Sequence, residues 1–286
     1  MAQAVRVEMT ARFSIITAAR GTSQPLQRCL ASVGDQCDAP VEHIVVYKEQ
    51  SPAEATLAGS HRILVQAPQA VGLYGALNQG LDAAQGELLA WLNDDEQYLP
   101  GTLTFVRHYF DEHPDVDMVF GDFLVVDEGG RLRAFRKGCA PRWPYILSAH
   151  LYVFSCALFF RRRVWESGLR FAAAFQSAGD MDFVARALRA GFRAAHVPRY
   201  FSTFTWTGDN MSSSAAARSE ERRIRGAAPA WVRWLRGPLN LARLLEKAGS
   251  GAYRQVWPLT YELYLDDLTR RTPLSAPSTS WRWPRR

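Results

Sequence analysis

Leu88–Glu96 reads LLAWLNDDE: five apolar side chains are followed at once by an amide and three carboxylates. The apolar run is typical of a strand buried on both faces of a parallel sheet. The polar cluster then falls at the carboxyl end of that strand, the edge at which open parallel sheets bind ligands. Crowded carboxylates repel one another unless a cation lies between them, and Mg²⁺ or Mn²⁺ often bridges carboxylates to a substrate's phosphates. The stretch predicts a metal–diphosphate site, with a solvated helix-capping turn as the alternative.

Strands and helices alternate on both sides of this stretch. Strand patterns occupy residues 13–19, 42–47 and 63–65, and helical spacing occupies residues 72–84, the segment after Ser23 and Pro25, and the segment around Leu103–Phe110. A hairpin pattern follows at 118–126 and 132–135, then a helix at 180–190 and mixed strand and loop at 192–206. This order predicts an α/β fold with a doubly wound, mainly parallel central sheet and helices on both faces.

The composition changes near residue 212, which predicts two parts. Residues 1–212 form the α/β domain, and residues 213–286 form a basic, tryptophan-containing extension and tail. We expect helices at 239–247 and 258–271, and poor order from Pro273 to Arg286. Trp143–Phe160 has 18 residues without a formal charge, but it contains a proline, two serines and a histidine. We therefore expect buried loop and strand there, and no membrane span.

Composition narrows the class of partner. The formal net charge is +6, and arginine binds phosphate through a bidentate fork, so the balance fits phosphorylated ligands or anionic lipid. No recognised nucleic-acid motif is present, and we expect no nucleic-acid partner. The four cysteines lack metal or disulfide spacing and the first ten residues lack an apolar signal core, which indicates a cytoplasmic protein.

Four motifs, in order, resemble those of family 2 glycosyltransferases with the GT-A fold, of the bacterial cell-surface polysaccharide type. The likeness covers roughly residues 11–212. The motifs are the opening strand FSIIT (Phe13–Thr17) with its following helix Gln27–Val33, the helix GLYGALNQG (Gly72–Gly80), the run from Gly86-Glu87 to Asn93-Asp94-Asp95-Glu96, and GDMDF (Gly179–Phe183) followed by Arg186-Ala187-Leu188 and Gly191-Phe192.

The resemblance implies an inverting, metal-dependent glycosyltransferase in surface-glycan (polysaccharide or lipopolysaccharide) assembly. The donor is a nucleotide-diphosphate sugar, which we expect to be a UDP-sugar, and the acceptor is a hydroxyl of a glycan or lipid-linked sugar. Asp95 would hold Mn²⁺ or Mg²⁺, which neutralises the departing diphosphate. Asp180 would be the catalytic base, with a helix N-cap as its alternative role. The expected donor-binding residues are Thr17, Ala18, Arg20, Tyr47, Glu49, Asn78, Asn93 and Asp94.

Departures from the family pattern leave alternatives open. Thr17-Ala18-Ala19-Arg20 replaces the usual Pro-Thr-Tyr-Asn, Gly75 replaces an aspartate, and Asn93 replaces the first aspartate of the DxD motif. The segment Ala18–Ser23 faintly resembles the phosphate loop of sugar nucleotidyltransferases. A catalytically decayed GT-A scaffold is a further alternative. The basic tail either contacts the inner face of the cell membrane or packs as a helical pair on the catalytic domain.

Overall fold

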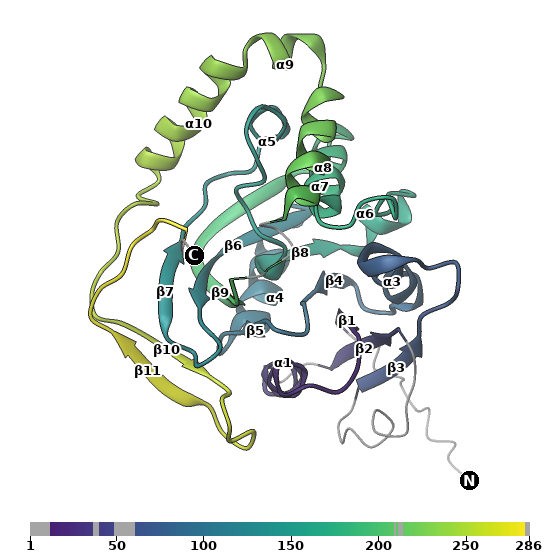
Figure 1. Cartoon of the computed structure of the whole chain (residues 1–286), viewed down its shortest axis with the longest axis vertical. Coiled ribbons are helices and arrows are strands. Elements are labelled where there is room, and N and C mark those ends of the chain that lie inside the picture. Colours follow the sequence, from purple (N-terminus) through teal and green to yellow (C-terminus); the bar gives the residue numbers. More distant parts are fainter. Residues whose placement is uncertain (1–11, 37–39, 49–60, 209, 211–213, 284–286) are drawn as a thin grey trace.

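The computed structural model describes residues 12–36, 40–48, 61–208, 210 and 214–283. In this part of the chain, nine strands form one sheet in the order β3-β2-β1-β4-β8-β6-β9-β5, with β7 on β6 (Figure 1). β1 to β4 run parallel and β8 runs antiparallel to β4 and β6, so the sheet is mixed and the predicted α/β class is confirmed. The strands are β1 Phe13–Ala19, β2 Val41–Tyr47, β3 His61–Val65, β4 Leu88–Trp91, β5 Gln97–Tyr98, β6 Met118–Val126, β7 Leu132–Arg136, β8 Leu158–Arg161 and β9 Ala194–Thr205.

Helices cover both faces of the sheet because alternate residues of its strands are apolar on opposite sides. Phe13 and Ile15 of β1 share one buried cluster with α1 (Gln24–Gly34) and α4 (Thr102–Glu112). Ile16 belongs to the opposite cluster, with α3 (Gly72–Ala83) and α7 (Gly179–Arg189). The strand that precedes the acidic turn is therefore sandwiched between two layers of helices.

A glycine allows the chain to enter β4. A Cβ atom on Gly86 would lie 2.5 Å from the backbone nitrogen of Ser14 in β1, a distance that real Cβ atoms do not show. The hydroxyl of Ser14 accepts a hydrogen bond from the Gly86 nitrogen at 2.7 Å. This close passage sets the register between β4 and β1, and hence the level at which the acidic turn leaves the sheet.

The long uncharged segment is part of the core, as predicted. It forms α5 (Trp143–Ser148), a short 3₁₀ turn η1 (Ser155–Ala157) and most of β8, which leads into α6 (Arg162–Glu166). Phe159 and Phe160 of β8 are fully buried. Among the described residues, no helix combines the length and the apolar character needed to cross a membrane.

The extension forms an arch of helices and a hairpin. α8 (Ala215–Gly226), α9 (Ala230–Trp234) and α10 (Arg236–Gly249) arch beside α5, and β10 (Leu259–Leu263) pairs with β11 (Thr272–Ala276) (Figure 1). The helix expected at 239–247 is confirmed. The helix expected at 258–271 is wrong, because β10 lies there and pairs with β11. The poor order expected from Pro273 is also wrong over β11, whose pairing with β10 holds the chain.

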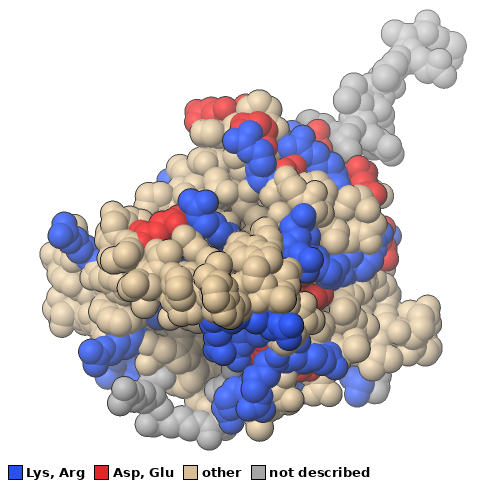
Figure 2. All heavy atoms as spheres, turned by 90° about the horizontal axis from the view of Figure 1, so that it is seen from above, with Lys and Arg blue, Asp and Glu red and all other residues tan. Residues whose placement is uncertain are grey.

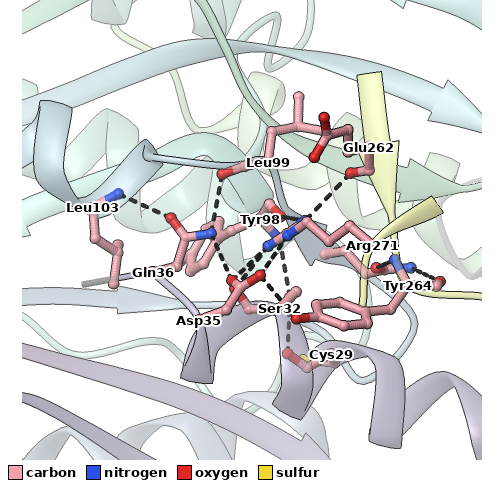
Figure 3. Close-up of polar contacts among 11 residues, drawn as sticks. Cys29, Ser32, Asp35, Gln36, Tyr98, Leu99, Leu103, Glu262, Tyr264 and Arg271 are labelled. Atoms are coloured by element: carbon pink, nitrogen blue, oxygen red, sulfur yellow. Dashed lines mark hydrogen bonds and ion pairs between the residues drawn. The ribbon is translucent and has the colours of Figure 1, made fainter. Parts of the chain in front are cut away.

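Arg271 ties the hairpin to the α/β domain (Figure 3). Its guanidinium donates to both carboxylate oxygens of Asp35, at 2.5 and 2.7 Å, and to the Tyr98 carbonyl at 2.9 Å. Tyr264 donates its hydroxyl to Asp35 at 2.9 Å and exchanges two hydrogen bonds with the side chain of Gln97. The hairpin is therefore held at the end of α1 and on β5 by polar contacts, of which those between Gln97 and Tyr264 are buried.

Candidate functional site

The acidic stretch forms a tight turn at the carboxyl end of β4. The Leu92 nitrogen donates to the Ile16 carbonyl at 2.9 Å, so pairing with β1 continues up to the turn. The Asn93 nitrogen then donates to a Glu96 carboxylate oxygen at 2.9 Å, and the Glu96 nitrogen donates back to the Asn93 carbonyl at 3.1 Å. Thr205, the last residue of β9, donates its hydroxyl to the Asp95 carbonyl. Both edges of the turn are therefore fixed.

The carboxyls of this turn lie where ionisation is costly. Asp94 and Asp95 are half-buried and Glu96 is buried. Burial and the charge of Asp94 raise the pKa of Asp95 to about 6. Burial likewise raises the pKa of Asp94, against the opposing charge of Arg20, and burial and the charge of Asp95 hold the pKa of Glu96 well above its usual range. A cation placed here would stabilise the ionised forms.

The donor set fits a divalent metal that is shared with a diphosphate. In the described residues, no group of three or more His, Cys, Asp and Glu side chains is arranged to hold a metal by itself. Cations that work on phosphates, however, take one or two carboxylates from the protein and their other ligands from phosphate and water. Asp94 and Asp95 supply such a pair, and one oxygen of the neighbouring Glu96 is buried without a hydrogen-bond partner among the described residues.

Asp180 lies in the first turn of α7. Its side chain accepts a hydrogen bond from the Met181 nitrogen at 2.8 Å, and its backbone nitrogen donates to the Tyr74 hydroxyl at 3.3 Å. Burial raises the pKa of Asp180 to about 6. The cap position is occupied by Ala178, so the alternative of Asp180 as the N-cap is wrong. Gly179 permits this geometry, since a Cβ atom there would lie 2.7 Å from the Tyr74 ring.

A cluster of aromatic rings connects the two acidic positions. Trp91 of β4 packs edge-on against Phe171 with ring centroids 4.9 Å apart, and Phe171 stacks on Phe183 of α7 at 4.5 Å. Tyr74 of α3 stacks on the same Phe171 at 5.4 Å. Trp91 directly precedes the acidic turn, and Phe183 follows Asp180 by three residues. The same aromatic cluster therefore supports the acidic turn and Asp180.

The expected donor-binding residues fall into two groups. Thr17 and Tyr47 have fully buried side chains, and the Thr17 hydroxyl lies 2.9 Å from Nε2 of His43. Asn78 binds the backbone of Phe171 through both amide atoms, each at 2.9 Å, and so connects α3 to the aromatic cluster. The second group is more accessible: Ala18 is half-buried, and Arg20 is exposed and acts electrostatically on Asp94. Asn93 and Asp94 belong to the turn, and Glu49 lies outside the described residues.

Steric crowding explains why position 75 is a glycine. A Cβ atom on Gly75 would lie 2.4 Å from the carbonyl carbon of Ala70, so no aspartate fits there. The loop before α3 is held close by Gln79, which accepts from the Ala67 nitrogen and donates to the Val65 carbonyl, both at 2.7 Å. Glycine in place of the usual aspartate therefore reflects the close contact between α3 and the loop that precedes it.

Sequence patterns missed one residue that supports the site. Glu220 of α8 accepts hydrogen bonds from three successive backbone nitrogens, those of Gln176, Ser177 and Ala178, at 2.7 to 3.0 Å. Partial burial acts to raise the pKa of Glu220, but these bonds keep it below its ordinary value. The extension thus holds the loop that leads into Asp180. Nothing in the local sequence distinguishes Glu220 from the other charged residues of α8.

Comparisons with known proteins agree with this geometry. The family model described as "Glycosyl transferase family 2" matches residues 14–169, more than half of the chain. A "PGL/p-HBAD biosynthesis glycosyltransferase" of Mycobacterium bovis (strain BCG / Pasteur 1173P2) is 27% identical over 181 residues, which cover 60% of this chain and 67% of that protein.

Two solved structures share the fold. Staphylococcus aureus TarS 1-349 in complex with UDP-GlcNAc has a TM-score of 0.61 at 17% identity, covering 83% of this chain and 73% of that one. The mannosyltransferase PcManGT from Pyrobaculum calidifontis, in complex with GDP-Man and Mn²⁺, has a TM-score of 0.51 at 16% identity, covering 85% of this chain and 76% of that one. With the acidic turn at the edge of a GT-A-like sheet, the matched model shows that this chain belongs to glycosyltransferase family 2.

Proposed function

We propose that the protein is an inverting, metal-dependent enzyme that moves a sugar from a nucleotide-diphosphate sugar to a hydroxyl acceptor. The observation that carries the proposal is the half-buried pair Asp94 and Asp95, whose pKa values are raised at the ligand-binding edge of the sheet. Such a pair is stabilised when a cation bound to a diphosphate neutralises it.

The residues at the carboxyl edge of the sheet would have different roles in binding the donor. Asp95 holds Mn²⁺ or Mg²⁺ and Asp94 lies beside it, while Asn93 and the exposed Arg20 contact the nucleotide. The metal, when bound, supplies positive charge that stabilises the departing nucleoside diphosphate. Asn78 positions α3 through its two bonds to Phe171. The buried hydroxyl of Thr17 is engaged with His43, and Thr17 pairs with Val45 of β2. Thr17 would therefore support the donor site from within the sheet, and Ala18 and Arg20 would lie nearer to the donor.

Asp180 is the proposed base. Its pKa of about 6 leaves it ionised at neutral pH yet more basic than an ordinary aspartate, which suits removal of a proton from a hydroxyl nucleophile. One base on the face of the sugar opposite the diphosphate implies direct displacement, and hence inversion at the anomeric carbon.

The relatives support a role in surface-glycan assembly. One is named a PGL/p-HBAD biosynthesis glycosyltransferase, and two structural neighbours were solved with UDP-GlcNAc or with GDP-Man. We propose a UDP-sugar as donor and a glycan or lipid-linked sugar as acceptor. The family assignment argues against the nucleotidyltransferase alternative. A catalytically decayed scaffold would belong to the same family, and the release assay below distinguishes it from an active enzyme.

The outer face of the extension suits contact with the cytoplasmic face of a membrane. Trp234 is 85% exposed, and Leu241 and Leu245, one turn apart on α10, are 58% and 65% exposed. Large apolar side chains next to arginine are typical of interfacial helices on anionic lipid. The double variant Leu241→Gln and Leu245→Gln should lose co-sedimentation with phosphatidylglycerol vesicles. Unchanged sedimentation would refute this contact.

Nucleoside diphosphate release tests the activity. Purified protein is incubated with a panel of nucleotide sugars, with Mn²⁺ or with chelator, and release of the diphosphate is measured. We expect Mn²⁺-dependent release that Asp95→Asn abolishes and that Glu112→Gln, an exposed acidic control in α4, leaves intact. Release that is equal in chelator, or equal in Asp95→Asn, would overturn the metal role.

A further inference from the structure

α10 is an amphipathic helix that buries charged residues and exposes apolar ones, the reverse of the usual arrangement in a soluble protein. Its buried residues are Arg243 and Lys247, whereas Leu241, Leu244 and Leu245 are exposed. Water-soluble helices normally bury the apolar stripe and expose the charged one. Both the exposed leucines and the buried cations are unusual. The buried cations are the more unusual, because burying a charge without a compensating partner costs free energy.

The inward face of α10 borders a hollow of about 520 Å³. Arg236, Asn240, Arg243 and Lys247 follow helical spacing, so they project on one side of α10. Across from them lies the end of α5 with the residues that follow it. The hollow is lined by Ser148, Ala149, His150, Arg236, Gly237, Asn240 and Arg243.

The cations here have neutral partners. Arg236 donates to the Ser148 carbonyl at 2.9 Å, Arg243 donates to the side-chain oxygen of Asn240 at 2.8 Å, and the Lys247 ammonium lies 5.6 Å from the ring centre of Tyr253. Within the described ranges, none of these three cations forms an ion pair with a carboxylate. Figure 2, which views this helical end of the molecule, shows Lys and Arg gathered beside an uncharged band.

The neighbouring carboxylates are already engaged. Glu246 of α10 pairs with Arg142 at 3.1 Å. The buried Asp122 is hydrogen-bonded to Nε2 of His196 at 2.7 Å and accepts from the Gly138 nitrogen at 2.9 Å. Glu221 lies 3.6 Å from Arg225, which itself donates to the Ala149 carbonyl at the edge of the hollow. The hollow therefore carries an excess of positive charge.

The lowered pKa values of Lys247 and His150 agree with this excess of positive charge. Burial and the charges of Arg136 and Arg243 lower the pKa of Lys247 to about 8, against opposing effects of Cys139 and Asp122. Desolvation and the charges of Arg243, Arg136, Lys247 and Arg225 lower the pKa of His150 to about 4. A bound anion would relieve the repulsion that these shifts report.

We propose that this hollow binds a phosphate group, carried either by the acceptor or by the membrane lipid beside which the acceptor is presented. Two guanidinium groups, Arg236 and Arg243, with Asn240 between them, match the donors that phosphate recognition uses. The exposed leucines of the same helix would then face the acyl chains while the inward stripe holds the head group. The proposal rests on the proposed function for its place in acceptor recognition, but phosphate binding can be measured without catalysis.

Inorganic phosphate is the soluble probe, titrated calorimetrically into the full chain in chelator at low salt. We expect saturable binding that Arg236→Gln weakens about tenfold or more, since it removes a charged hydrogen-bond donor. Arg236 is exposed, so this variant should fold even where Arg243→Gln, which replaces a residue only 5% exposed, does not. The matched control is Arg233→Gln, an exposed arginine of α9 outside the hollow. Binding that is absent in the wild type, or equal in Arg236→Gln and wild type, overturns the proposal.

A second arm separates the two sources of phosphate. Vesicles of phosphatidylglycerol or phosphatidylcholine are compared with the same variants. Loss of phosphatidylglycerol binding together with loss of phosphate binding assigns the hollow to a lipid head group, whereas loss of phosphate binding alone assigns it to the acceptor. Asp95→Asn should bind phosphate as the wild type does, because Asp95 lies outside the hollow. If the wild type binds phosphate but turns over no nucleotide sugar, the proposed activity fails and the phosphate site stands.

Discussion

Replacing Arg271 should weaken the attachment of the C-terminal hairpin to the α/β domain. The Arg271 side chain is 7% exposed and donates to Asp35 and to the carbonyls of Tyr98, Ser32 and Glu262. The partly buried ion pair contributes about 2 kcal/mol, and the three carbonyl contacts, two of them long, contribute about 1–2 kcal/mol together. Arg271→Gln should therefore lower the free energy of unfolding by about 3–4 kcal/mol.

Thermal unfolding followed by circular dichroism measures this loss. For a chain of this size about 3–4 kcal/mol corresponds to a fall in Tm of roughly 6–12 °C. The neighbouring Arg270 supplies a matched control, because its side chain is 84% exposed and its ion pair with Asp267 lies on the surface. Arg270→Gln should change stability by less than about 0.5 kcal/mol. Equal Tm values for the two variants would refute the reasoning that this cluster holds the hairpin.

Three further outcomes concern the site. Asp180→Asn should lower kcat by about 10²–10⁴-fold with no loss of Tm, measured by nucleoside diphosphate release, because a general base is removed while a costly buried charge disappears. The pKa of Asp95, about 6, lies above its ordinary 3.8. The metal-free protein should therefore lose stability as pH rises from about 4 to 6, a loss that differential scanning calorimetry should find reduced in Asp95→Asn, because Asp180, whose pKa is also about 6, still contributes its share. Glu220→Gln should lower kcat about tenfold, because an amide offers one acceptor and two donors to three backbone nitrogens; the adjacent Glu221→Gln should not.

Local chemistry predicted the parts of the fold that are determined locally. The apolar run into Asn93 was predicted as a buried strand because parallel strands covered on both faces need continuous apolar sequence, and β4 fulfils this. Ser23 was predicted to start a helix, and its hydroxyl accepts from the Leu26 nitrogen at 3.2 Å as the cap of α1. Such features depend on neighbours within a few residues of sequence.

The predictions that were wrong or missing concern residues whose partners lie far away in the sequence. The segment after Pro258 was predicted as a helix, yet Leu259–Leu263 is a strand because residues 272–276 lie beside it and the two pair backbone to backbone. Glu220 was missed for the same reason, since its three hydrogen-bond donors lie more than forty positions earlier in the chain. The sequence around each segment contains neither partner.

The orientation of α10 shows a deeper limit. Periodicity in Arg236–Gly249 indicates that the helix has an apolar and a charged side, and a soluble protein would be expected to bury the apolar one. That expectation assumes that water is the only medium outside. The structure buries Arg243 and Lys247 and exposes Leu245, an orientation that the phosphate group proposed for the inside and the lipid proposed for the outside would both stabilise. Periodicity therefore predicts the two faces of a helix, but the surroundings of the helix decide which face is buried, and the sequence of α10 alone does not contain that information.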